Sequence, residues 1–308
     1  MNLLLTGAFN YKPGQIEVLR KLGLNIYFLQ YENEQLPIPA NDIDAIICNG
    51  LFLYHELSEF TNLKYIQLTS AGFDRVPLEA INAHGIVIKN ARGVYSIPMA
   101  EWAVCKVLDV YKGSANMINC QRTHTWAKNR SMKEITGKRV AILGAGNVGS
   151  EVARRFKAFS ATVIGYDITI FENSAFDQIR PIQDFITEAC NYDIIIVTLP
   201  LTPHTRGLIG YEILKNLKTD AVFVNIARGA IVDTDALIDI LGYRHDITAI
   251  LDVFDTEPLL EDSPLWDIPN IIVSPHNSFV SDGNNARMFD AIITNLKLYL
   301  ENQSCLLY

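Results

Sequence analysis

Residues Arg139–Gly149, with the sequence RVAILGAGNVG, decide the fold of this chain. Residues 139–143 form an apolar run typical of a buried strand, and the apolar spacing over 148–159 is typical of a helix. Asp167 stands 18 residues after Gly149 and follows the next apolar run, 162–166. A strand, a GxGxxG turn, a helix, a second strand and a terminal carboxylate together predict a βαβ unit that binds a dinucleotide.

The spacing of the glycines has a physical reason. Gly144 permits the tight turn, Gly146 lets a pyrophosphate approach the backbone, and Gly149 lets the helix pack closely on the strand. The anion would then lie on the free N–H groups at the helix N-terminus. A glycine turn without a ligand is the alternative, and the agreement of strand, turn, helix and acid argues against it.

Asp167 predicts which cofactor is bound. A carboxylate at this position accepts a hydrogen bond from a ribose 2′-hydroxyl and repels a 2′-phosphate. Residues 168–170, Ile-Thr-Ile, offer no arginine to hold that phosphate. We therefore expect NAD rather than NADP.

Short apolar runs alternate with helical patterns on both sides of this unit. Unbroken Ile/Val-rich runs are typical of parallel strands that are covered on both faces. The sequence therefore predicts an α/β fold, with about six strands of its second half in one Rossmann-type doubly wound parallel sheet. Strands are expected at 2–6, 26–29, 43–48, 63–69, 86–88, 139–143, 162–166, 193–199, 221–226, 247–253 and 271–273, and helices at 15–22, 99–120, 148–159, 182–189 and 281–302.

Arg228, Glu257 and His276 each follow an apolar run of this predicted sheet. Ligands of such sheets lie at the carboxyl ends of the strands, so we expect the three side chains to face one crevice. An arginine fork binds a carboxylate and polarises the neighbouring carbonyl, and a histidine exchanges a proton with the resulting hydroxyl. A glutamate bonded to that histidine fixes its tautomer. Each residue alone is more often a surface or turn residue, and the set together predicts hydride transfer at a 2-oxo acid.

Composition excludes several classes of function. The 308 residues are 49% hydrophobic and 19% charged, which is typical of a globular protein, and 26 Lys+Arg against 34 Asp+Glu give a net charge of −8. Without a basic cluster, neither a nucleic-acid nor a membrane partner is expected. The five cysteines (Cys48, Cys105, Cys120, Cys190, Cys305) are scattered, so we expect reduced thiols in the cytoplasm. No histidine has metal-ligand spacing, so no metal is expected.

From about residue 60 to 290 the chain resembles the D-isomer-specific 2-hydroxyacid dehydrogenase family. The matching blocks are Leu143–Gly149, Leu199–Ile209, Asn225–Asp233, Leu251–Pro258 and Ser274–His276. The resemblance implies that Arg228 binds substrate, that His276 is the acid/base and that Glu257 is its partner. It also implies further contacts: Asn147 and Val148 to the pyrophosphate, Thr198, Leu199, Pro200 and Thr205 on the adenosine side, Ile226, Ala227, Asp252 and His276 toward the nicotinamide, and Ser70, Ala71 and Gly72 to the substrate carboxylate.

The chain departs from the family pattern in places. Many relatives carry His where this chain has Thr198. Relatives that act on phosphoglycerate carry Arg-Ser after the strand that here ends in Cys48-Asn49-Gly50, and no such arginine is present. Residues 51–54, Leu-Phe-Leu-Tyr, would make an apolar pocket wall that favours branched or aromatic 2-oxo acids over phosphohydroxypyruvate. The alternative is that they pack the core of their own domain.

The resemblance implies two domains. A discontinuous, flavodoxin-like substrate domain would comprise 1–95 and 281–308, and an NAD-binding domain would comprise 96–280. The expected function is NAD-dependent interconversion of a small 2-oxo acid and its D-2-hydroxy acid, by a homodimer. A phosphoglycerate- or formate-type dehydrogenase of the same fold remains an alternative, as does a non-catalytic NAD-sensing regulatory protein.

Overall fold

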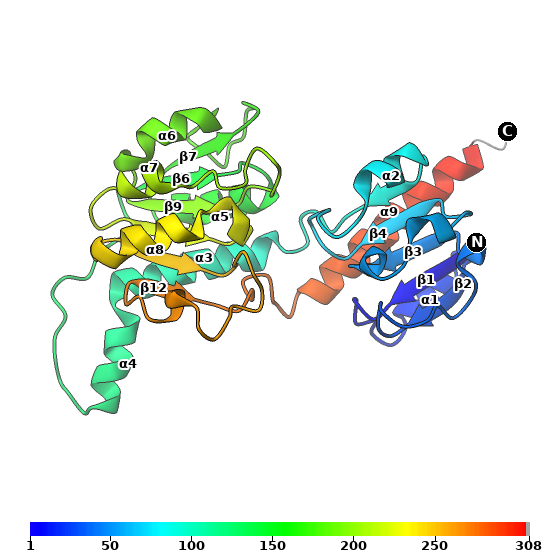
Figure 1. Cartoon of the computed structure of the whole chain (residues 1–308), viewed down its shortest axis with the longest axis horizontal. Helices are drawn as coiled ribbons and strands as arrows, with labels where there is room; N and C mark the ends of the chain where they lie inside the picture. Colours follow the sequence, from blue (N-terminus) through cyan, green and yellow to red (C-terminus); the bar gives the residue numbers. More distant parts are fainter. Residues whose placement is uncertain (306–308) are drawn as a thin grey trace. The chain divides into compact units, whose positions relative to one another are not determined.

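The computed structural model describes residues 1–305. The chain divides into two compact units, which are unit 1 (Met1–Tyr95 and Ser281–Tyr308) and unit 2 (Ser96–Val280). Each unit has its own parallel sheet and its own core (Figure 1). Residues 306–308, the end of the predicted substrate domain, lie outside the described residues.

Unit 2 contains the predicted doubly wound sheet. Its strands lie in the order β12-β11-β10-β9-β6-β7-β8, and every described pairing is parallel. The chain starts at β6, winds outward to β8, returns past β6 to β9 and winds to β12, as the dinucleotide-binding fold requires. The α/β prediction is therefore confirmed. The bounds are β6 Arg139–Leu143, β7 Thr162–Asp167, β8 Gln178–Pro181, β9 Ile194–Val197, β10 Val222–Asn225, β11 Thr248–Leu251 and β12 Ile271–Val273.

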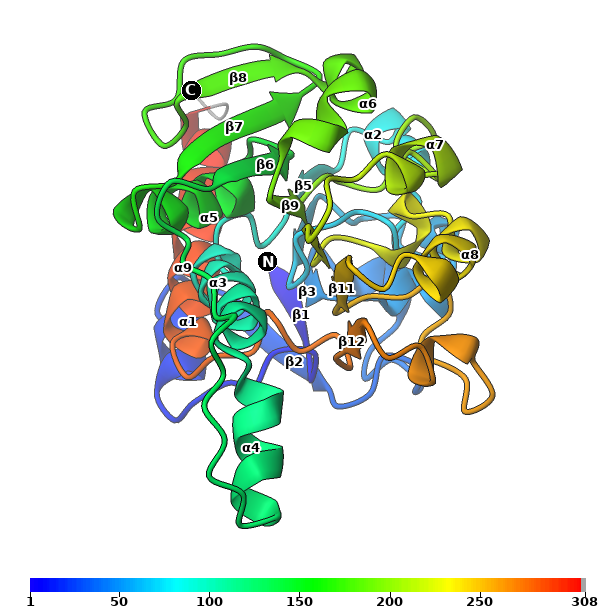
Figure 2. The ribbon, with the colours of Figure 1, turned by 90° about the vertical axis from the view of Figure 1, so that its left-hand side faces the viewer.

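Helices cover both faces of this sheet. Figure 2 shows α3 and α5 on one face and α6, α7 and α8 on the other. Ile142 and Ile196 face the first group, and Tyr166 and Phe223 face the second, all four being almost fully buried. The bounds are α3 Ser96–Lys112, α4 Ser114–Arg122, α5 Asn147–Ala158, α6 Phe185–Glu188, α7 Tyr211–Lys215 and α8 Thr234–Tyr243, with short 3₁₀ turns at Ile182–Asp184, Ala189–Asn191, Gly229–Ile231 and Pro264–Trp266.

Two predictions for unit 2 were wrong in detail. The helix expected over 99–120 is two helices, because Gly113 adopts a left-handed conformation (φ 65°) that ends α3 and lets α4 leave in a new direction. The helix expected over 182–189 is a single turn of α-helix flanked by 3₁₀ turns. The edge strand β8 was not predicted, because Gln-Ile-Arg-Pro lacks an apolar run.

Unit 1 has a sheet of order β2-β1-β3-β4-β5, again parallel, which is the flavodoxin-like order. Helix α9 (Asn284–Cys305) packs with α1 (Gln15–Arg20) on one face, where Met288, Ile292 and Leu296 are buried at the predicted spacing. Helix α2 (Leu78–Ala83) packs on the other face. The strands are β1 Asn2–Thr6, β2 Asn25–Leu29, β3 Ala45–Cys48, β4 Tyr65–Leu68 and β5 Val87–Lys89, with 3₁₀ turns at Ala40–Asp42, Leu51–Leu53 and Leu57–Glu59.

Within residues 1–305, no helix is both long enough and apolar enough to cross a membrane. The four cysteines whose side chains are described are free thiols, and Cys305 lies outside that set.

Candidate functional site

The candidate site of unit 2 lies along the carboxyl edge of its sheet. Leu143 pairs with Val197, Val197 with Asn225, Asn225 with Leu251, and Leu251 with Val273. These strand ends therefore lie side by side, about 4.8 Å apart from one strand to the next. Every site residue predicted for unit 2 belongs to this edge or to a loop that leaves it.

The glycine turn after β6 fits the phosphates of a dinucleotide. A Cβ on Gly149 would lie 2.0 Å from the Gly144 carbonyl oxygen, so only glycine permits this close approach, and Gly144 itself has φ +103°. The N–H groups of Gly146, Asn147 and Val148 find no acceptor among the described residues. They open the twelve-residue helix α5, so they and the positive end of its dipole are available to an anion.

Asp167 ends β7 beside this turn. Its Oδ2 accepts the Ala145 N–H at 2.7 Å and its Oδ1 accepts the Ile168 N–H at 2.8 Å. The carboxylate is therefore held at the mouth of the glycine turn, half-buried, as a ribose contact requires.

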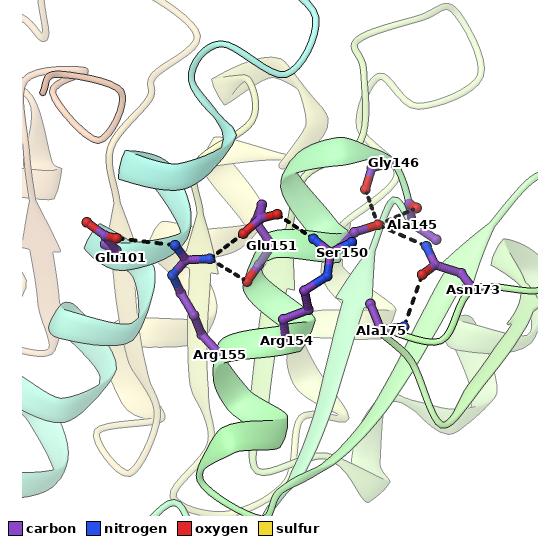
Figure 3. A network of polar contacts seen from close by, with 9 residues as sticks. All are labelled: Glu101, Ala145, Gly146, Ser150, Glu151, Arg154, Arg155, Asn173 and Ala175. Carbon is purple, nitrogen blue, oxygen red and sulfur yellow. Dashed lines mark hydrogen bonds and ion pairs between the residues drawn. The ribbon is translucent and has the colours of Figure 1, made fainter. Parts of the chain in front are cut away.

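A polar network fixes the loop that follows Asp167 (Figure 3). Asn173 donates from Nδ2 to the Ser150 hydroxyl at 2.9 Å, and that hydroxyl donates to the Gly146 carbonyl at 2.7 Å. The Ala175 N–H in turn donates to Oδ1 of Asn173 at 3.0 Å. On the same helix, Arg155 pairs with Glu101 of α3 and so ties α5 to α3. The sequence prediction missed Ser150 and Asn173, which no motif marked.

The residues predicted on the adenosine and nicotinamide sides have mainly internal partners. The Thr198 hydroxyl donates to the Gly144 carbonyl at 2.8 Å and thereby helps to fix the glycine turn. Thr205 is buried and donates to the Pro200 carbonyl at 2.7 Å, which closes its own loop. Leu199, Ile226 and Ala227 are buried, and Pro200 is exposed at the edge. The backbone of these loops is therefore well fixed.

His276 and Glu257 form the predicted pair. The imidazole Nδ1 lies 2.8 Å from Glu257 Oε2, and each side chain keeps 34% of its surface exposed. Oε1 of Glu257 accepts the Phe254 N–H at 3.0 Å, so the carboxylate is itself oriented. With Nδ1 bonded to a carboxylate, Nε2 is the ring nitrogen left to exchange a proton with a ligand.

Asp252 holds the loop that carries His276. The side chain is fully buried after β11, and it accepts hydrogen bonds from the Ser274 hydroxyl (2.6 Å) and from the N–H groups of Asn277 (2.8 Å) and Ser278 (2.9 Å). The Asp252 carbonyl also accepts the His276 N–H at 2.8 Å. His276 has φ 53°, a conformation that costs a non-glycine residue free energy and that this set of bonds maintains.

Arg228 follows β10, the strand next to β11. Asn225 pins its loop, since the Asn225 side chain donates to the Arg228 carbonyl at 3.0 Å and accepts the Ala227 N–H at 3.1 Å. Arg228 Nη1 donates to the Ala227 carbonyl at 2.8 Å, and the side chain is half-buried. Arg228, Glu257 and His276 thus follow three neighbouring strands, β10, β11 and β12.

In unit 1, the Ser70–Gly72 turn follows β4 and has its carbonyl oxygens tied back. Ser70 O accepts the Ala91 N–H at 2.9 Å, Ala71 O accepts the Asn90 side chain at 2.6 Å, and Gly72 O accepts the Ser70 hydroxyl at 2.9 Å. The N–H groups of Ala71, Gly72 and Phe73 donate to no acceptor in residues 1–305. These N–H groups are therefore available to a ligand.

Of the predicted apolar wall at 51–54, the first two residues pack into the core of unit 1 and the last two are exposed. Leu51 is fully buried and Phe52 packs edge-on against Phe60 in the core of unit 1, so the packing interpretation is correct for these two residues. Leu53 and Tyr54 are more than half exposed. Burial, together with the charge of Glu32, raises the pKa of the neighbouring Cys48 thiol, so this cysteine is unreactive.

Comparisons with known proteins identify the family. Residues 104–278 match the model of the D-isomer specific 2-hydroxyacid dehydrogenase NAD binding domain. The chain is 30% identical over 275 residues to a glyoxylate/hydroxypyruvate reductase of Arabidopsis thaliana, and the match covers 88% of this chain and 84% of that protein. It is 32% identical over 265 residues to a D-3-phosphoglycerate dehydrogenase of Methanocaldococcus jannaschii, covering 85% of this chain and 50% of that protein. The chain therefore spans about half the length of that phosphoglycerate dehydrogenase.

Among solved structures, an NADPH-dependent glyoxylate/hydroxypyruvate reductase from Sinorhizobium meliloti, in complex with NADP and malonate, superposes with a TM-score of 0.81. It is 26% identical, and the alignment covers 97% of this chain and 93% of that one. The matched family model spans more than half of the chain, and the Arabidopsis relative is matched over most of its length. The chain belongs to the D-isomer specific 2-hydroxyacid dehydrogenase family.

Proposed function

We propose that this protein is an NAD-dependent oxidoreductase that interconverts a small 2-oxo acid and its D-2-hydroxy acid. The observation that carries this proposal is the His276–Glu257 contact of 2.8 Å, in the loops after β12 and β11. These loops leave the same sheet edge as the Arg228 loop after β10 and the glycine turn after β6. One part of this edge offers the start of a helix to an anion, and the other part holds an acid/base pair and an arginine. This combination suits hydride transfer to a carbonyl beside a carboxylate.

The roles follow from the chemistry of each side chain. Arg228 would bind the substrate carboxylate through its fork and polarise the adjacent carbonyl. His276 would donate a proton to the carbonyl oxygen during reduction and remove it during oxidation. Glu257 would keep the imidazole in the required tautomer. A nicotinamide cofactor would supply or accept the hydride.

Residues of unit 2 would hold that cofactor. The N–H groups of Gly146, Asn147 and Val148 would receive its pyrophosphate, and Asp167 its adenosine ribose. We propose NAD rather than NADP, because residues 168–173 after Asp167 include no Lys or Arg. The Sinorhizobium relative, in contrast, is described as NADPH-dependent. Unit 2 would thus be the NAD-binding domain.

Unit 1 would be the substrate domain. We propose that the free N–H groups of the Ser70–Gly72 turn bind an anionic group of the substrate. We also propose a homodimer, supported by helix α4, which projects away from the sheet of unit 2 (Figures 1 and 2).

A panel assay tests the proposal. Purified protein is incubated with a set of 2-oxo acids and either NADH or NADPH, and cofactor oxidation is followed by absorbance at steady state. We expect turnover with at least one acid and a preference for NADH of at least roughly tenfold in kcat/KM, because one charge repulsion at Asp167 corresponds to about 1.4 kcal/mol. Tight NADH binding without turnover of any acid would instead favour a non-catalytic sensor. Equal efficiency with both cofactors would contradict the role of Asp167.

A further inference from the structure

The loop after β3 in unit 1 is closed by a carboxylate of the protein itself. Oε1 of Glu32 accepts the Thr6 hydroxyl at 2.8 Å and the Asn49 N–H at 2.7 Å, and Oε2 accepts the Gly50 N–H at 2.7 Å. Successive backbone N–H groups of this kind are a common anion site. Because Glu32 already occupies them, a substrate anion at this edge needs another partner.

Arg75 supplies a cation at the same place. It belongs to the loop between β4 and α2, and its side chain is exposed. The position of a Cβ on Gly50 would lie 3.7 Å from Arg75 Cδ and 3.6 Å from Glu32 Oε2, so the arginine stem lies against the β3 loop. No ion pair or hydrogen bond joins its guanidinium to another group within the described part of the chain.

The free N–H groups of the Ser70–Gly72 turn neighbour this arginine. Cys48 pairs with Leu68 in parallel register, so Gly50 and Ser70 each stand two residues beyond a paired position. Arg75 comes three residues after Gly72 and lies against Gly50. The turn and the guanidinium therefore belong to one loop, which leaves the sheet edge after β4. This loop offers both the N–H donors and a positive fork, beside the loop that follows β3.

We propose that Arg75 determines substrate specificity by binding a second anionic group, a carboxylate or a phosphate attached at carbon 3, of a substrate whose other anionic group binds the free N–H groups of the Ser70–Gly72 turn. This inference rests on the proposed function. A guanidinium fork binds either anion in bidentate fashion. Glu32 places one negative charge nearby, but three hydrogen bonds from Thr6, Asn49 and Gly50 already occupy and hold its carboxylate oxygens. The preferred substrate is therefore a 2-oxo acid with a second anionic group, in place of the branched or aromatic acids that the sequence suggested.

The test compares substrates that differ in the second anion. With NADH, kcat and KM are measured for 3-phosphohydroxypyruvate and oxaloacetate, and for 3-hydroxypyruvate and pyruvate as references. The variants are Arg75→Met, Arg75→Lys and, as a matched control, Arg20→Met, which removes an exposed arginine from α1 of the same unit. The ratio of interest is kcat/KM for an acid with a second anionic group divided by kcat/KM for its reference acid. We expect Arg75→Met to lower this ratio at least roughly tenfold, mainly through KM. Arg75→Lys should fall between, and Arg20→Met should leave the ratio unchanged.

Two results would overturn this role of Arg75. One is a wild-type protein that prefers the monoanionic acids, and the other is an Arg75→Met ratio within roughly threefold of the wild type. If the wild type reduces no 2-oxo acid at all, the proposed function is wrong, and thermal unfolding decides about Arg75 separately. In that case 3-phosphoglycerate should raise the unfolding midpoint of the wild type more than D-lactate does, and Arg75→Met should abolish the difference. An equal rise with both ligands would contradict the site.

Discussion

Arg228 can be tested by a substitution that keeps its positive charge. Lysine keeps the positive charge and much of the stem, but it cannot make the planar two-pronged contact to a carboxylate. The Asn225 bonds that fix the loop use the backbone and remain in the variant. We expect Arg228→Lys to lower kcat/KM about 100-fold or more, equivalent to about 2.7 kcal/mol, with an unchanged circular dichroism spectrum. Near-native kcat/KM would show that Arg228 does not bind substrate.

Asp252 is tested through the residues that it holds. In Asp252→Asn the amide can accept only on one side, so at least one of the Ser274, Asn277 and Ser278 donors faces an N–H group in a buried place. A buried donor without an acceptor costs about 1–3 kcal/mol. We expect lower stability in urea unfolding, and a fall in kcat larger than any rise in KM for NADH, because His276 is displaced.

The control for Asp252 is Ser274→Ala. It removes one hydrogen bond and leaves both Asp252 oxygens accepting from Asn277 and Ser278. It should give a smaller loss of the same kind. A normal kcat in Asp252→Asn, despite lower stability, would show that the loop reaches its working position without this carboxylate.

At the scale of strands and helices, the prediction succeeded where the apolar pattern is strong. Runs such as Ile194–Val197 are buried on both faces, so hydrophobicity alone marks them. The glycine turn could also be predicted, because its chemistry depends on residues that are adjacent in the sequence. Strand β8 could not, since it is held by pairing with β7 at the sheet edge rather than by an apolar run. The break at Gly113 was likewise hidden by the continuous helical spacing around it.

The end of α8 offers a pH test at this scale. Arg244 donates to the carbonyls of Lys215 and Leu217, and its hydrogen bond with Asp246 lowers the pKa of that carboxyl to about 2, against the effect of burial. The folded protein therefore keeps Asp246 charged below the ordinary pKa, and the stability gained is present near neutral pH and lost as the pH falls from about 4 to 2. We expect Asp246→Asn to destabilise by about 1 kcal/mol or less at pH 7, since the pair is partly exposed.

The measurement for Asp246 is urea unfolding at several pH values. The difference between wild type and Asp246→Asn should shrink toward zero between about pH 4 and pH 2. Asp239→Asn, which changes an exposed carboxylate on α8, is the control and should show no such trend. A difference that persists unchanged at pH 2 would mean that the charge of Asp246 does not stabilise the fold.

For the whole molecule, sequence reasoning reached the two doubly wound sheets and the edge that gathers Arg228, Glu257 and His276. It did not reach the internal carboxylate of unit 1. Glu32 is 26 residues from Thr6 and 17 from Asn49, so no local spacing connects the three, and only the order β2-β1-β3 brings their loops together. The sequence prediction also overlooked Arg75. It considered only residues 48–54 for a cation, and Arg75 reaches the β3 loop from the loop after β4.

Assembly is the property that belongs to the molecule as a whole. Helix α4 projects from unit 2 (Figure 2). It leaves Met117 and Ile118 about half exposed, and Trp126 just beyond it is 92% exposed. Val104, Leu108 and Phe159 line a groove where α3 meets α5, together with the charged side chains of Glu101, Asp109, Lys112 and Arg155. Exposed apolar side chains gathered on a projecting element suit a protein interface, and a second copy of this chain offers both the projection and the groove. We expect sedimentation velocity to show a dimer at micromolar concentration, and Ile118→Asp with Trp126→Asp to shift it to monomer with intact secondary structure. Tyr31→Asp, which changes an exposed aromatic residue of unit 1, should leave the dimer unchanged. A wild-type monomer, or a double variant that remains dimeric, would exclude α4 as the contact.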